Sequence, residues 1–134
     1  VEAIPCYHKG EPESALLEMA ARYPKIALGG VAGVTHPVEK MKWAEQCFAR
    51  VWPKRIHGFG FGAEFQIMGL PWESCDASNW EIGPTRFGTW IAFGGKMSVR
   101  GDSHNLRAQV NYYLRLQRRA TSRWAQTMKE IPAK

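Results

Sequence analysis

The sequence lacks the features that define several large classes of protein. Its three cysteines, Cys6, Cys47 and Cys75, form no Cys-x-x-Cys pair, and an odd number excludes a fully paired disulfide framework. No apolar run approaches the roughly 18 residues that a membrane span needs, and no signal peptide is visible. Low-complexity tracts are absent. We therefore expect a reducing, cytoplasmic environment and no membrane partner.

The composition is that of one folded, basic domain. The chain has 134 residues, of which 45% are hydrophobic, enough for a packed core in a single domain spanning residues 1–134. The formal net charge is +6. A positive charge of this size favours an anionic partner, such as nucleic acid or a phosphorylated substrate. A basic protein without a charged partner is the alternative.

Short apolar runs alternate with segments of helical periodicity over the first half of the chain. The runs predict strands at residues 3–7, 25–28, 55–57 and 71–76, with helices from residue 12, over residues 35–51 and over residues 63–68. The second of these helices, over residues 35–51, carries an apolar stripe made of Val38, Met41, Ala44, Cys47, Phe48 and Val51. Strands that alternate with helices predict a parallel sheet with right-handed crossovers.

Four β/α units are half of an eight-stranded barrel, which typically needs about 250 residues. The sequence therefore predicts an α/β fold, the half of a TIM-type barrel over residues 1–100, followed by a basic C-terminal helix over residues 103–130. Four parallel strands do not close a barrel alone. We expect an exposed apolar surface along Ile4, Ile26 or Ile56 that binds a second copy or a complementary half-barrel chain.

The region after residue 76 breaks the alternation. Residues 89–93 read as an extended piece, and the final helix places Leu106, Val110, Tyr113, Leu114 and Gln117 on one side. The same helix carries a series of basic residues that suits a phosphate backbone: Arg107, Arg115, Arg118, Arg119, Arg123 and Lys129. A solvated helix face without a ligand is the alternative.

Asp76 is the first candidate for chemistry. It follows an apolar strand and precedes a polar turn, so it belongs to the edge where parallel α/β sheets collect their catalytic groups. A carboxylate at this position serves as nucleophile, general base, metal ligand or helix cap. Glycines end the neighbouring strands at Gly29-Gly30 and at Gly58, where backbone amides can approach a flat ligand closely. Tight turns without a ligand explain them equally well.

The histidines give a weak metal signal. His8 and His57 lie at or near strand ends and, with Asp76, have the chemistry of a divalent metal site. No two histidines have the His-x-His or His-x-x-x-His spacing, so we expect no metal. A metal-dependent barrel hydrolase that uses these three residues is nevertheless the alternative enzyme class.

Three motifs taken together resemble a known superfamily. They are Leu28-Gly29-Gly30-Val31-Ala32-Gly33, then Arg55-Ile56-His57-Gly58-Phe59-Gly60, then Ser74-Cys75-Asp76-Ala77-Ser78-Asn79-Trp80. Their order and spacing resemble the C-terminal half of the tRNA-guanine transglycosylase superfamily, over roughly residues 1 to 100. The closer likeness is to its DNA-modifying branch from phages and bacteria, the deoxypurine-in-DNA protein A type.

The resemblance implies a TIM barrel that exchanges guanine for a 7-deazaguanine in DNA, or in RNA, without a cofactor. It implies that Asp76 is the nucleophile and that the base lies against Gly29, Gly30, His57, Gly58 and Trp80. Basic side chains would hold phosphates, and those that we assign to this role are Arg86, Arg115, Arg118 and Arg119.

The chain departs from the family in two respects. The half of the barrel that carries the family's general acid/base aspartate has no counterpart here, and the scattered cysteines cannot supply the zinc site of the tRNA branch. Both departures leave a third interpretation open, a non-catalytic nucleic-acid-binding remnant of a split barrel.

Overall fold

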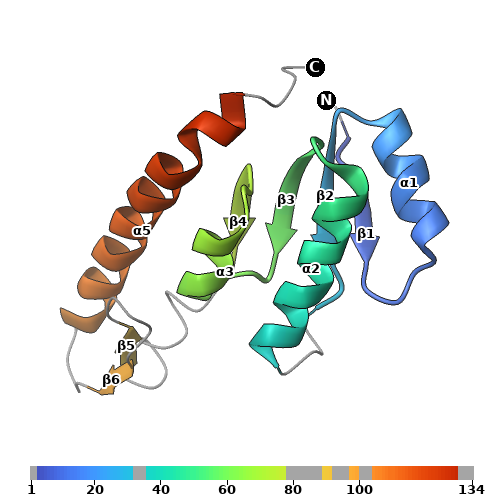
Figure 1. Cartoon of the computed structure of the whole chain (residues 1–134). Helices are drawn as coiled ribbons and strands as arrows, with labels where there is room; N and C mark the ends of the chain where they lie inside the picture. Colours follow the sequence, from blue (N-terminus) through green and yellow to red (C-terminus); the bar gives the residue numbers. More distant parts are fainter. Residues whose placement is uncertain (1–2, 32–35, 78–88, 92–96, 100–103, 130–134) are drawn as a thin grey trace.

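The computed structural model describes residues 3–31, 36–77, 89–91, 97–99 and 104–129. Four parallel strands form one sheet in chain order: β1 (Cys6–His8), β2 (Lys25–Gly29), β3 (Arg55–Phe59) and β4 (Ser74–Asp76). Helices α1 (Glu13–Arg22), α2 (Pro37–Val51) and α3 (Glu64–Gly69) join consecutive strands (Figure 1). The predicted α/β class, with its parallel sheet, is confirmed.

The order of the strands is the order that half of a (β/α)8 barrel requires. Each strand pairs with the next one along the chain, as in Ile26 opposite Ile56 and His57 opposite Ser74. An open parallel sheet can have the same order, because neither four strands nor their sequence decides whether a barrel closes. The assignment to a half barrel therefore remains a proposal.

The helices follow the apolar spacing closely. Helix α2 begins at Pro37, where a missing backbone N–H costs nothing, and its inward side chains are Met41, Ala44, Cys47, Phe48 and Val51. Val38 was predicted to join this stripe, but its side chain is exposed. It lies in the first turn of the helix.

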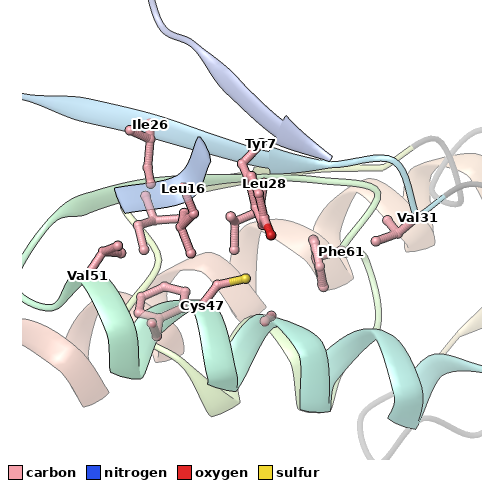
Figure 2. Packing of buried hydrophobic residues seen from close by; sticks show 11 residues of the cluster. Tyr7, Leu16, Ile26, Leu28, Val31, Cys47, Val51 and Phe61 are labelled. Atoms are coloured by element: carbon pink, nitrogen blue, oxygen red, sulfur yellow. The ribbon is translucent and has the colours of Figure 1, made fainter. Parts of the chain in front are cut away.

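The core lies between the sheet and the helices. Figure 2 shows Leu16, Ile26, Leu28, Cys47 and Phe61 packed together in this layer. Ile26 and Ile56 are 0% and 1% exposed, so the prediction that they form an open apolar surface is wrong. Both point toward the helix side, because strand side chains alternate and theirs fall in the α1 and α2 layer. Of the three residues in that prediction, Ile4 alone is exposed.

Two short strands and one long helix complete the described part of the chain. Strands β5 (Thr89–Ile91) and β6 (Met97–Val99) pair in antiparallel fashion, where the sequence predicted only one extended piece over residues 89–93. Helix α5 (His104–Lys129) runs beside β4 and α3, in the direction opposite to the strands (Figure 1). In the described residues, no helix is both long enough and apolar enough to cross a membrane.

Helix α5 is held on α3 by polar contacts. The hydroxyl of Tyr112 donates to Glu64 at 2.8 Å, that of Tyr113 donates to the carbonyl of Gly62 at 3.1 Å, and the indole of Trp124 donates to the carbonyl of Met68 at 3.0 Å. These bonds turn a different face of the helix inward from the one predicted: Gln109, Tyr112 and Leu116 are buried, whereas Val110, Leu114 and Gln117 are exposed.

Candidate functional site

The carboxyl ends of the four strands bring the predicted site residues to one edge of the sheet. His8 pairs with Gly29, and Phe59 pairs with Asp76, so these four residues form a row across β1 to β4. The ring of Phe59 is 45% exposed and lies between Gly29 and Asp76. Parallel strands are about 4.8 Å apart, so β2 and β4 leave about 10 Å between them. The Phe59 ring fills part of this span, because a Cβ on Gly29 would lie 3.7 Å from its Cδ2.

Two nitrogen atoms approach the Asp76 carboxylate. The backbone N–H of Gly60 donates to the Asp76 backbone carbonyl at 2.9 Å and lies 3.3 Å from Oδ1, and Nε2 of His57 lies 3.5 Å from Oδ2. Gly60 has a φ of +80°, a conformation that glycine adopts without strain, and this turn directs its N–H at the end of β4. The Asp76 side chain is 57% exposed, so the carboxylate is accessible from solvent.

The His57 ring lies between Asp76 and the hydroxyl group of Ser74. Its Nδ1 lies 2.7 Å from Oγ of Ser74, the residue directly opposite in the β3–β4 register. Its ring meets Phe59 edge to face at 4.5 Å between centroids. With 18% of its side chain exposed, His57 is a half-enclosed group at the site rather than a core residue.

Ser74 and Gly60 were not among the predicted site residues. The sequence contains a pattern for each of them. Ser-x-Asp places Ser74 and Asp76 on the same face of a strand, and Gly-x-Gly indicates the turn that follows β3. What the sequence does not give is the β3–β4 register, which decides that Ser74 and not a neighbour faces His57.

Local packing accounts for the three glycines that were predicted to contact a base. A Cβ on Gly29 would lie 2.8 Å from Sγ of Cys6, and one on Gly30 would lie 2.9 Å from Cβ of His8. A Cβ on Gly58 would lie 2.8 Å from the ring of Trp72, on the helix side of the sheet. Close packing is thus sufficient to require glycine at each position, and contact with a base stays a prediction.

Charged groups at the opposite end of the sheet form a structural cluster. Glu73 forms ion pairs with Lys25, at 2.8 Å between Nζ and Oε2, and with Arg55. These side chains are partly buried at the amino ends of β2, β3 and β4, where the two positive charges offset the carboxylate. We assign this cluster to stability rather than to ligand binding.

The cysteines have raised pKa values. Burial raises the pKa of the Cys47 thiol and that of the Cys75 thiol to about 12 each. Burial also raises the pKa of Cys6, with a smaller contribution from Glu11. The reactive form of cysteine is the thiolate, so none of the three is an efficient nucleophile at neutral pH.

A cavity of about 800 Å³ lies between β4 and α5, with Asp76 in its lining. Its walls are mostly apolar and aromatic, among them Phe61, Ile67, Trp72, Leu116, Trp124 and Met128. The charged groups of its described lining are both carboxylates, Glu73 and Asp76. Gly29, Gly30 and His57 are not part of this lining, so Asp76 stands between the cavity and the row of strand ends.

Helix α5 accounts for the whole net charge of the chain. It contains six lysines and arginines and no aspartate or glutamate, and the chain has a net charge of +6. Arg115 and Arg118 are exposed. Arg119, in contrast, lies 3.5 Å from Glu64 of α3, which gives it a part in docking the helix. Trp80 and Arg86, the remaining predicted site residues, lie outside the described residues.

The residues of the hydrolase alternative do not form a metal site. The described part of the chain contains no group of three or more His, Cys, Asp or Glu side chains placed to hold a metal ion. His8 instead faces Glu11, whose carboxylate accepts from the His8 backbone N–H at 2.7 Å and lies 3.5 Å from Nδ1. This hydrogen bond also satisfies a backbone N–H of β1, which lies at the edge of the sheet.

No family model, curated protein or solved structure matches the chain. The geometry of the site and the sequence motifs are therefore the two sources for a functional proposal.

Proposed function

We propose that this chain is part of a transglycosylase that exchanges guanine for a 7-deazaguanine in nucleic acid, DNA in preference to RNA, with Asp76 as the nucleophile. The observation that carries the proposal is the Asp76 carboxylate itself. It ends a parallel strand, accepts from the backbone N–H of Gly60, lies 3.5 Å from Nε2 of His57 and has a side chain that is 57% exposed. The same edge carries Gly29 and the exposed ring of Phe59.

The proposed reaction is a double displacement. An oxygen of Asp76 forms a bond to C1′ of the nucleotide while the bond from C1′ to guanine breaks, and guanine leaves with the electron pair and takes up a proton. The incoming base then loses the proton of its attacking ring nitrogen, forms a bond to C1′ and releases Asp76 as the carboxylate. Positive charge develops on the sugar in both steps and is stabilised by the adjacent carboxylate. The exchange is redox neutral, so it requires no cofactor.

A duplex substrate has to release its base from the stack before Asp76 can reach C1′. Phe59, exposed beside Asp76, is the described aromatic residue best placed to stack on that base. The exposed arginines of α5, Arg115 and Arg118, supply the phosphate contacts. The DNA and the 7-deazaguanine are thus the two proposed ligands of the chain.

A second chain completes the proposed enzyme. The family's proton-transferring aspartate belongs to the other half of its barrel, so we propose that a second copy or a complementary half-barrel chain supplies it. The exposed side of the sheet, with His8, His57 and Asp76, is where such a half would face the substrate.

The test is incorporation of a labelled 7-deazaguanine into DNA and into tRNA, with the complementary half added. Asp76→Asn should lower the rate by about 10⁴ or more, because an amide is nearly isosteric with the carboxylate but a far poorer nucleophile. Glu39→Gln, at an exposed position of α2, is the matched control and should retain full activity. An active Asp76→Asn variant would remove Asp76 as the nucleophile.

The charge of α5 favours a second candidate, a nucleic-acid-binding protein without catalysis. Six basic side chains on one helix with no acidic neighbour on it suffice for binding a polyanion. This candidate predicts that the chain binds DNA but transfers no labelled base, with or without a complementary half. It also predicts that Asp76→Asn changes neither property.

A further inference from the structure

Ser74, His57 and Asp76 form one line of contacts on the exposed side of the sheet. Ser74 and Asp76 are two residues apart on β4, so their side chains share a face, and His57 lies opposite Ser74 on β3. Nδ1 of His57 is 2.7 Å from Oγ of Ser74, and Nε2 is 3.5 Å from Oδ2 of Asp76. The imidazole therefore lies between a hydroxyl group and the proposed nucleophile.

The donors and acceptors of this line favour one neutral arrangement. An ionised carboxylate only accepts hydrogen bonds, so Nε2 has to carry the proton if it is to bond Asp76. In the neutral imidazole Nδ1 then has a free lone pair, and the Ser74 hydroxyl donates to it. The opposite tautomer would set the lone pair of Nε2 against the carboxylate, which is repulsive.

The position of His57 also decides what kind of role it has. In a double displacement the leaving base departs from the face of the sugar opposite to the nucleophile. A general acid therefore lies across the sugar from Asp76, whereas Nε2 of His57 contacts the carboxylate of Asp76. His57 acts through Asp76 and is a positioning residue rather than the proton donor to the base.

We propose that the Asp76 carboxylate selects the His57 tautomer protonated at Nε2, and that the Ser74 hydroxyl, by bonding Nδ1, fixes the imidazole ring so that this N–H orients the carboxylate for attack on C1′. The effect on attack rests on the proposed function. The choice of tautomer does not, because it follows from the contacts among the three side chains in the free protein.

The tautomer can be read directly from long-range ¹H–¹⁵N spectra of the imidazole rings in uniformly labelled protein at neutral pH. His57→Gln identifies the signals of His57 among the four histidines. The wild type should show His57 protonated at Nε2 alone. Asp76→Ala should give a mixture of tautomers, because the remaining Ser74 hydroxyl can either donate to Nδ1 or accept from it, whereas Ser74→Ala should keep the proton on Nε2. Ser122→Ala, an exposed serine of α5, should change nothing at His57.

Three spectral results would overturn the proposal: protonation at Nδ1 in the wild type, protonation at both nitrogens, or an unchanged tautomer in Asp76→Ala. In the base-exchange assay, Ser74→Ala should lower the single-turnover rate about tenfold, as removal of a residue that orients a functional ligand does. Ser74→Thr, which keeps the hydroxyl, should recover it. An unchanged rate in Ser74→Ala would overturn the role in attack. Absence of exchange by the wild type, together with the expected spectra, would overturn the proposed function and leave the tautomer assignment standing.

Discussion

Gly58→Ala tests whether this glycine serves the packing of the sheet or the binding of a base. A Cβ at Gly58 would lie 2.8 Å from Cζ3 of Trp72 and 3.0 Å from Cδ2 of Phe61. The Trp72 ring cannot move aside easily. It packs edge to face on Phe48 at 4.9 Å, it packs on Phe61 at 4.7 Å, and its Nε1 donates to the carbonyl of Gln66 at 2.9 Å.

Overpacking of a rigid core typically costs 1–3 kcal/mol, and the clamped ring places Gly58→Ala at about 2 kcal/mol. The unfolding entropy is about 2.1 cal/mol/K per residue, so a chain of 134 residues should lose about 7 °C in Tm. Thermal unfolding followed by circular dichroism measures this loss.

Gly69→Ala is the matched control for this substitution. The Cβ of that variant would meet only Cε of Met41, the far end of a flexible side chain. The change also favours the helix by up to about 1 kcal/mol, so its Tm should stay level or rise slightly. If Gly58→Ala melts within about 2 °C of the wild type, the packing argument is wrong. If that variant has also lost base exchange, contact with a ligand becomes the reason for the glycine.

Two further predictions concern the charge of α5 and the buried thiols. The double substitution Arg115→Gln with Arg118→Gln should reduce the slope of log K, the DNA association constant, against log salt concentration by about 2, because each arginine contacts one phosphate. Arg22→Gln on α1 is the control and should leave the slope unchanged. Fluorescence anisotropy titrations from about 50 to 200 mM salt measure the slope. Because burial raises the pKa of Cys47 and of Cys75 to about 12 from the ordinary value of 9.0, the folded state keeps both thiols protonated at a pH at which those of the unfolded state ionise. Their stabilising contribution is complete below pH 9 and declines between pH 9 and 12, by at most about 1.4 kcal/mol per pH unit for each thiol. Urea unfolding at pH 8 and at pH 10 measures this loss of unfolding free energy. The loss should be smaller in Cys75→Ala than in the wild type, and an equal loss in the two proteins would contradict the reasoning.

The sequence was informative wherever local chemistry dominates. Apolar runs, prolines and helical spacing were sufficient to find all four parallel strands and the helices that connect them. The boundaries moved at β1, which begins at Cys6 rather than at residue 3, because strand pairing with β2 decides where a strand starts. Periodicity failed for α5, where Val110 and Leu114 are exposed and Tyr112 and Leu116 are buried.

The failure on α5 has a physical reason. Hydrophobic spacing treats Tyr and Trp as apolar, but the hydroxyls of Tyr112 and Tyr113 and the indole N–H of Trp124 each have an acceptor on or next to α3. These partners are more than 40 positions away along the chain, so no local pattern reports them. The contact of Ser74 with His57 was missed for the same reason, since it depends on the register between two strands.

The distribution of charge around Asp76 bears on how nucleic acid could reach it. The described lining of the cavity contains two carboxylates, but Glu73 is paired with Lys25 and Arg55, so Asp76 carries the negative charge of this lining; the exposed arginines of α5 lie outside it. A phosphate is repelled from Asp76 and attracted to those arginines. An uncharged base meets no such barrier, and in the proposed reaction a sugar that becomes positively charged is stabilised beside this one carboxylate. This arrangement favours a path on which the backbone stays outside along α5 and a single extruded nucleotide turns inward to Asp76, as base flipping requires.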